Sequence, residues 1–309
     1  MKRIVVIGAG AVGGCIAGLL TKAGRPVVVV ARGDHGLAIK QEGLSVKFPN
    51  RTVHSSPECQ SDITEVDWQD GDVAVIATKL NDYQQLLPEL VKASGAKLPV
   101  VCASNGVQGE LWAEQHFETV VSMLIWMPSV HLHPGDVRAY GEDCPGVLDV
   151  GPTKGSDADQ VSLELSQWLT EAGFDSLHRP DIKNWKYAKW ITNLGNAAQA
   201  LVTDDWKSVA KAAQAEGELI LEAAGIERIA TKELLNRAAK IKLKPIDGER
   251  RPGGSTWQSF KRGKPLETEW LEGAMAKLAN QFNVPAPVLY AIVSAAEAGR
   301  TVTAAEVLS

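Results

Sequence analysis

The chain has 309 residues, enough for about two domains, and 45% of them are hydrophobic, an ordinary share for a globular protein. A formal net charge of −5 argues against nucleic-acid binding, and no uninterrupted apolar run approaches the roughly 18 residues of a membrane-spanning helix. The four cysteines form no CxxC pair, and no charged leader precedes the first apolar run. These features predict a cytoplasmic protein with reduced thiols and with neither a membrane nor a nucleic acid as partner.

The first patterned segment covers residues 4–14, which read IVVIGAGAVGG. A β-branched run leads into glycines spaced GxGxxG, and residues 15–23 then favour a helix. A strand, this glycine spacing and a helix form the dinucleotide-binding fingerprint, in which the pyrophosphate lies at the helix N-terminus. The predicted cofactor contacts are Gly8, Ala9, Gly10, Ala11, Val12 and Gly13.

Arg32 follows a second predicted strand at residues 26–30. NAD-binding proteins usually carry Asp or Glu at the tip of this strand, whereas NADP-binding proteins place an arginine there for the 2′-phosphate. The planar guanidinium of Arg32 suits a phosphate, although Asp34 follows two residues later. The sequence therefore predicts NADP(H) as the cofactor, and the alternative for Arg32 is a solvated surface arginine.

Short apolar runs alternate with helical patterns through the rest of the first half. A strand, a helix and a strand are predicted at residues 72–77, 82–94 and 98–103. Three apolar runs within residues 120–151 predict further strands of the same sheet, some of them antiparallel, and residues 160–172 favour a helix. This rhythm is typical of a parallel sheet covered by helices. His131 and His133 have no third ligand nearby in sequence and are interpreted as exposed strand residues, not a metal site.

From Pro180 onward the strand signal almost vanishes. Helices are predicted at residues 181–201, 214–224, 231–240, 266–282 and 287–298, and a polar loop at residues 244–254. The chain is therefore predicted to be an α/β protein, with a Rossmann-type dinucleotide-binding domain at residues 1–178 and an all-α domain at residues 179–309.

Lys189 and Asn193 are four residues apart and share one face of a predicted helix. A carbonyl reductase needs a proton donor beside the hydride acceptor, and a lysine can serve if burial or neighbouring charge brings its pKa towards neutrality. The pair could point into a cleft between the two domains. The alternative for an isolated helical lysine is a solvated side chain, which is expected for Lys183 and Lys186.

Taken together and in order, the motifs resemble those of the ketopantoate reductase (2-dehydropantoate 2-reductase) family over almost the whole chain. The matching motifs are the glycine loop with Arg32, Ala77-Thr78-Lys79, Asn105-Gly106-Val107, Lys189-x-x-x-Asn193, and a loop serine with a helix-opening glutamate twelve residues later, Ser255 and Glu267.

The resemblance implies that NADPH reduces a 2-oxo acid, in the first place 2-dehydropantoate to pantoate. Lys189 would be the general acid, and Glu267 would bind the substrate hydroxyl and help to place Lys189. Asn193 and Ser255 would bind substrate, Lys79 would hold the cofactor, and Asn105 would position both.

Each of three residues also has a purely structural interpretation. Ser255 could cap a helix, Glu267 would be favoured at a helix start by the dipole, and Asn105 before a glycine is a common turn residue.

Position 197 departs from the family pattern. Family members often carry a second amide one turn after the first, but this chain has Ala197, and Asn196 would point about 100° away around the helix. Ala197 therefore favours one alternative, a reductase of another 2-keto acid or of an imine. A further alternative is an NADPH-binding sensor without turnover, against which the set of Lys189, Asn193, Ser255 and Glu267 argues. A homodimer is implied by the family alone.

Overall fold

The computed structural model describes residues 1–309, which form two compact units. The first, called the sheet unit, comprises Met1–Ser104, Gly109–Lys183 and Leu235–Arg251; the second, called the helical unit, comprises Asn105–Gln108, Asn184–Leu234 and Pro252–Ser309. The return of Leu235–Arg251 to the sheet unit was not expected from the sequence, and the division into domains at residues 178 and 179 stays a prediction. No helix is long and apolar enough to cross a membrane.

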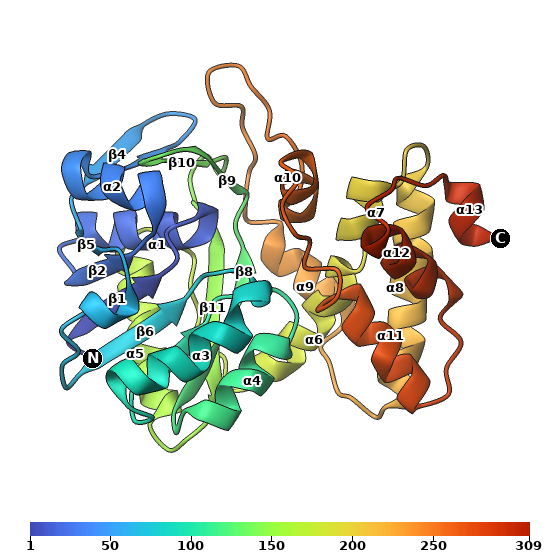
Figure 1. The fold of residues 1–309 in the computed structure, drawn as a ribbon, viewed down its shortest axis with the longest axis horizontal. Coiled ribbons are helices and arrows are strands. Elements are labelled where there is room, and N and C mark those ends of the chain that lie inside the picture. The colour runs from blue at the N-terminus through green and yellow to red at the C-terminus, as the bar shows by residue number, and fades with distance from the viewer. The chain divides into compact units, whose positions relative to one another are not determined.

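The sheet unit is built on a seven-stranded sheet, which can be followed in Figure 1. Its strands are β1 (Arg3–Ile7), β2 (Val27–Val30), β5 (Glu58–Gln60), β6 (Asp72–Ile76), β7 (Val100–Cys102), β8 (Val120–Trp126) and β11 (Val147–Lys154). Their order is β11-β8-β7-β6-β1-β2-β5, and every pair is parallel except β11 with β8. The six parallel strands have the order of a Rossmann sheet, which confirms the predicted α/β class.

Helices of the sheet unit alternate with these strands along the chain. They are α1 (Ala11–Lys22), α2 (Gly33–Glu42), α3 (Leu80–Ser94), α4 (Gln108–His116) and α5 (Ala158–Glu171), with a 3₁₀ turn η1 (Ile63–Glu65). The strands β2 and β6 are buried at every residue, as the helix-covered strands of a parallel sheet require. Helices α3 and α5 occupy segments that the sequence predicts as helices.

A second sheet corrects the prediction for residues 120–151. Strands β3 (Leu44–Lys47), β4 (Thr52–Ser55), β9 (Ser129–His133) and β10 (Asp136–Ala139) form a separate sheet in the order β4-β3-β10-β9. Only β8 and β11 join the main sheet. Pro128 separates β8 from β9, and a proline cannot donate to a strand ladder, so the chain leaves the main sheet there.

The helical unit packs its helices around one apolar core, and it contains no strand. Its elements are α6 (Ile182–Asn193, which begins in the sheet unit), α7 (Asn196–Leu201), α8 (Trp206–Ala223), α9 (Thr231–Ala238, which ends in the sheet unit), α10 (Ser255–Lys261), α11 (Glu272–Gln281), α12 (Pro287–Glu297) and α13 (Ala304–Leu308).

The single helix predicted at residues 181–201 is wrong, because the chain breaks between α6 and α7. A Cβ on Gly195 would lie 3.0 Å from Ala210 Cβ, so this glycine lets α8 approach closely. The Gln214 side chain donates to Thr192 O at 3.3 Å, and Glu272 Oε1 accepts from Ala197 N at 3.2 Å. Side chains of α8 and α11 therefore pair with backbone groups at the break, as is typical of a kink where a side chain inserts into the helical ladder.

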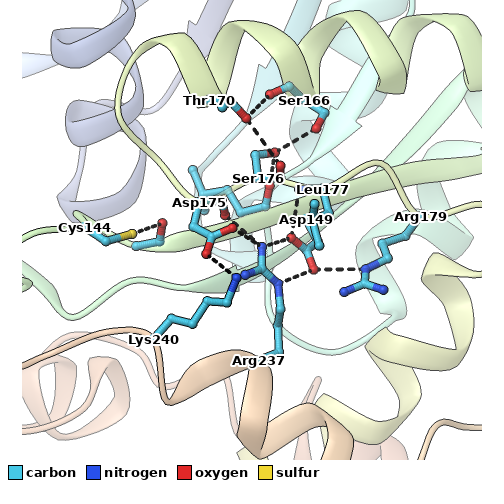
Figure 2. A network of polar contacts seen from close by, with 12 residues as sticks. Cys144, Asp149, Ser166, Thr170, Asp175, Ser176, Leu177, Arg179, Arg237 and Lys240 are labelled. Atoms are coloured by element: carbon cyan, nitrogen blue, oxygen red, sulfur yellow. Dashed lines mark hydrogen bonds and ion pairs between the residues drawn. The ribbon is translucent and has the colours of Figure 1, made fainter.

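The returning segment Leu235–Arg251 is held to the main sheet by a buried ionic network (Figure 2). Arg237, only 5% exposed, donates from Nη2 to Asp149 Oδ1 at 2.6 Å and from Nε to Asp149 Oδ2 at 2.9 Å. Arg237 also pairs with Asp175 at 2.7 Å, and Arg179 with Asp149 at 3.2 Å. Burial opposes the charge of Arg237, but hydrogen bonds to Asp149 and Asp175 raise its pKa overall.

Candidate functional site

The glycine loop connects β1 to α1 and has the shape that a pyrophosphate requires. Gly8 has φ +93°, and a Cβ on Gly13 would lie 1.9 Å from Gly8 O, so neither position accepts a side chain. A Cβ on Gly10 would meet nothing within 4 Å, which leaves the backbone open on that side. Gly10 is the N-cap of α1 and no side chain caps this end, so its first N–H groups are available to an anion.

A cavity of about 180 Å³ continues from this loop, within the sheet unit. Gly8 and Ala9 of the loop line it together with Arg32, Asp62 and other residues. Arg32 is exposed at the N-cap of α2. The cavity therefore brings two of the six predicted loop contacts, Gly8 and Ala9, together with Arg32. Thr78 also lines it, and Lys79 follows as the N-cap of α3.

Asp62 is a cavity residue that the sequence analysis missed. Parallel pairing of β5 with β2 brings Gln60 opposite Val30, and the chain after β5 then places Asp62 in the same cavity as Arg32. Hydrogen bonds from the N–H and hydroxyl of Thr64 lower the pKa of Asp62, and the charge of Arg32 lowers it further. No local pattern predicts this, because 30 residues separate the two side chains.

His35 is a second residue that the sequence analysis missed. Its Nδ1 accepts from Gly135 N at 2.9 Å, so Nε2 carries the proton and donates to Ala9 O at 2.7 Å. The imidazole thereby ties the glycine loop to the turn between β9 and β10. His131 stacks on this ring at 4.0 Å and is half-buried, unlike its expected exposure, whereas His133 is exposed. No group of three or more His, Cys, Asp or Glu side chains is arranged to bind a metal ion.

Lys189, Asn193 and Asn105 come together in the helical unit. Lys189 and Asn193 lie one turn apart on α6 and are 7% and 5% exposed. Lys189 Nζ donates to Asn105 Oδ1 at 2.9 Å and to Asn193 Oδ1 at 3.4 Å. Asn105 belongs to a turn in which Gly106 has φ +70° and lies close to Leu271.

The pKa of Lys189 is lowered to about 7, first by burial and then by the positive charge of Lys186. Lys186 is itself buried, which corrects the expectation of a solvated side chain, whereas Lys183 is exposed as expected. An ammonium with a pKa near neutrality can hold a proton and release it at physiological pH. This is the electrostatic requirement for the proposed acid.

Ser255 and Glu267 each lie in the kind of local structure that was expected for the other. Ser255, expected in a loop, is the first residue of α10, whose N-cap is Gly254. Glu267, expected to open a helix, lies in turns before α11, where the N–H groups of Trp270 and Leu271 bond back to its carbonyl. Leu271 has φ −107° and ψ −80°, outside the helical region, so the helix predicted at residues 266–282 begins only at Glu272. The Glu267 side chain is 6% exposed.

Glu272 is a buried acid that the sequence analysis missed. It is 1% exposed, and burial raises its pKa to about 8, with a smaller contribution from the charge of Glu267. A signal existed: Glu272 lies on the same side of α11 as Ala276 and Ala279, so a charged residue interrupts an apolar stripe.

Two family models match the chain: "Ketopantoate reductase PanE/ApbA" over residues 4–155 and "Ketopantoate reductase PanE/ApbA C terminal" over residues 181–299. The 2-dehydropantoate 2-reductase of Mesorhizobium japonicum is 24% identical over 94% of this chain and 96% of its own length. That of Archaeoglobus fulgidus is 26% identical over 93% and 94%.

Solved structures have the same fold. A PanE/ApbA family ketopantoate reductase from Ralstonia eutropha JMP134 has a TM-score of 0.80 at 22% identity, covering 96% of this chain and 98% of its own. A D-mandelate dehydrogenase with NADH and anilino(oxo)acetate has a TM-score of 0.79 at 19% identity, with the same coverage. Because the two family models together span most of the sequence, the chain belongs to the ketopantoate reductase family, whose members are oxidoreductases that act on a CH–OH group.

Proposed function

We propose that the protein reduces a 2-oxo acid with NADPH, and that 2-dehydropantoate is the substrate and pantoate the product. The reaction adds one hydride to the C2 carbonyl carbon and one proton to its oxygen, which gives a secondary hydroxyl. The observation that carries the proposal is the buried Lys189 ammonium, with a pKa of about 7 and hydrogen bonds to two amide oxygens. General acids work best when their pKa lies near the working pH.

Each side chain of the helical unit has a proposed role. Lys189 Nζ donates its proton to the carbonyl oxygen as negative charge develops there, and burial strengthens this interaction. Asn105 and Asn193 accept hydrogen bonds from the ammonium and so hold it, and Asn193 also binds substrate. Ser255 is proposed to bind the substrate carboxylate, and Glu267 its hydroxyl.

The sheet unit fits a dinucleotide at the glycine loop, where Gly10 leaves open space and the α1 N-terminus is uncapped. When bound, NADPH supplies the hydride. We propose that residues 8–13 hold the pyrophosphate, that Arg32 holds the 2′-phosphate, and that Lys79 and Asn105 contact the cofactor elsewhere.

The substrate is tested by mixing the protein with NADPH and 2-dehydropantoate and following the loss of NADPH absorbance. Rapid turnover that yields pantoate is expected. If the protein turned over no 2-oxo acid, it would be a protein that binds NADPH without catalysis, and the proposal would be overturned.

The cofactor is tested by comparing the Kd of NADPH and NADH for the wild type and Arg32→Ala. We expect the variant to lose about tenfold or more in NADPH affinity and little in NADH affinity, because a charge-assisted contact to phosphate is removed. An NADPH affinity equal to that of the wild type would contradict the role of Arg32.

A second candidate substrate is a different 2-keto acid, and Ala197 favours it because the second family amide is missing. The likeness to a D-mandelate dehydrogenase makes an aryl 2-oxo acid a sensible member of the test panel. The ratio of kcat/KM values across the panel decides between the two substrates.

Two further expectations stay proposals. We propose a cytoplasmic location, which the four free cysteines support, and a homodimer, which the family implies.

A further inference from the structure

Buried polar side-chain atoms without a hydrogen-bond partner lie on two neighbouring segments of the helical unit. Among them are Asn193 Nδ2, Thr268 Oγ1 and Glu272 Oε2. Buried polar atoms are nearly always paired in proteins, so these unpaired atoms need an explanation such as a ligand that is bound there. Asn193 belongs to the lysine site already described, whereas the resemblance assigns no role to Glu272.

The Glu272 carboxyl lies at the break between α6 and α7. Its Oε1 accepts from Ala197 N, at the second residue of α7, while Oε2 remains without a partner. Ala197 is one turn beyond Asn193 and is fully buried. The carboxyl thus lies beside the position where the family often carries a second amide.

The protonation state of Glu272 follows from its surroundings. Burial raises its pKa to about 8, the N–H groups of Glu272 and Ala197 lower it, and the charge of Glu267 raises it. At neutral pH the carboxyl is therefore protonated. With Oε1 accepting, Oε2 carries the proton, and the group offers one acceptor and one donor, as a side-chain amide does.

Few charged groups lie on the elements packed around Glu272. Helix α7 carries no titratable side chain, and α12 carries Tyr290 and Glu297, which are both exposed. On α8, Glu216 is engaged with the N–H groups of Val288 and Leu289. The remaining charged side chains of α8 are Lys207, Lys211, Glu218 and Glu222. On α11 itself, Lys277 is exposed, and Lys186 and Lys189 lie on α6.

We propose that Glu272 is a substrate-binding residue that acts as a neutral carboxylic acid: Oε2–H donates to an oxygen of the 2-oxo acid, together with the amide of Asn193. This inference rests on the proposed reductase function. It assigns to Glu272 the contact that Ala197 cannot make, and the small side chain of Ala197 leaves room for the carboxyl. An anionic or carbonyl oxygen is the group that these two donors would select.

The test compares Glu272→Ala, which removes the donor, with Glu272→Gln, which keeps a donor and an acceptor but does not titrate. Glu269→Gln is the matched control, because Glu269 precedes Glu272 by three residues and its side chain is 59% exposed. For Glu272→Ala we expect KM for 2-dehydropantoate to rise by about 10- to 100-fold, with kcat and the Kd of NADPH changed by less than about threefold. The control should match the wild type.

The pH dependence of KM separates substrate binding from a structural role. The donor exists below a pKa of about 8 and is lost as the pH rises through it, so the wild-type KM should increase above that pH. Glu272→Gln should keep a low KM that does not change there. Adding Ala197→Asn to Glu272→Ala should restore part of the affinity, because it returns an amide to this position. Infrared spectra should show a protonated-carboxyl band in the wild type that Glu272→Gln lacks.

Two results would overturn the inference: an unchanged KM in Glu272→Ala, or a KM of Glu272→Gln that follows the wild-type pH profile. If the wild type reduces no 2-oxo acid, the proposed function fails separately, and calorimetric binding of pantoate then decides. Weaker binding to Glu272→Ala than to the wild type would still support the contact, whereas equal binding, or none to either protein, would refute it.

Discussion

Arg237 and Lys189 are both buried cations, one in each unit. Their surroundings shift the pKa of the two groups in opposite directions. Arg237 is 5% exposed and contacts Asp149 and Asp175, which together raise its pKa. Lys189 is 7% exposed, donates to two amide oxygens and is repelled by Lys186, and its pKa falls to about 7. A buried cation that is paired with carboxylates keeps its proton and holds structure together, whereas one whose charge is opposed by burial and by a neighbouring cation is ready to release its proton.

The largest expected effect is on catalysis. Lys189→Ala removes the proposed proton donor, so kcat should fall by about 10²- to 10⁴-fold, the usual contribution of general acid catalysis. NADPH affinity should stay near that of the wild type, because the glycine loop and Arg32 belong to the sheet unit. Steady-state kinetics and fluorescence titration with NADPH measure both quantities, and full turnover in the variant would refute the mechanism.

Removing the charge of Arg237 and removing that of Lys189 should change the stability of the fold in opposite directions. Arg237→Met leaves Asp149 buried without its main partner, so the free energy of unfolding should drop by about 3–5 kcal/mol. Lys189→Met removes a group whose charged form is disfavoured in the fold, so it should raise stability. The folded-state pKa of about 7 lies below the ordinary 10.5, so the penalty is complete below pH 7 and is relieved as the pH rises towards 10.5.

Thermal unfolding at pH 6 and pH 10 distinguishes these effects. The gain in Lys189→Met should be larger at pH 6, while Arg237→Met should be destabilised at both values. A loss of stability in Lys189→Met at pH 6 would mean that the lysine contributes to structure as Arg237 does.

Lys186→Met removes the like charge beside Lys189 and so separates its effect on the pKa of Lys189 from that of burial. The pKa of Lys189 should rise, so the pH at which kcat declines should move upward, while the exposed Lys183→Met serves as the control and should leave it in place. Because burial is the larger cause, the shift should be smaller than the total lowering of the pKa. An unchanged midpoint would show that burial alone sets the pKa.

The smallest effect concerns Arg32, an exposed cation that shares its cavity with Asp62. The carboxylate of Asp62 is expected to repel a 2′-phosphate, so Asp62→Asn should lower the Kd of NADPH by a few-fold and leave that of NADH almost unchanged. The ratio of the two Kd values measures this. Weaker NADPH binding in the variant would mean that Asp62 supports the cofactor instead.

Much of the fold could be predicted because its signals are local. The GxGxxG spacing and the i, i+4 pair of Lys189 and Asn193 each lie within one turn or one helix. The second sheet and the helix break could not be predicted, because they depend on strand pairing and on side chains from α8 and α11.

The parts of the site that the sequence did not reveal depend on distant neighbours. Asp62 reaches Arg32 only through the pairing of β5 with β2, and His35 reaches Gly135 across 100 residues. The sequence predicts Lys186 as solvated, whereas it is buried, because burial depends on neighbours that are distant in the sequence. Only Glu272 had a signal in the sequence, because it is a charged residue on an apolar stripe of α11.

Burial makes Lys189 an acid that titrates near neutrality, and the pH dependence of a single turnover measures this titration. With enzyme in excess over NADPH and 2-dehydropantoate saturating, the rate of NADPH oxidation should be highest where Lys189 is protonated. We expect this rate to fall as the pH rises through about 7. A rate that stays constant up to the ordinary lysine pKa of 10.5 would contradict it.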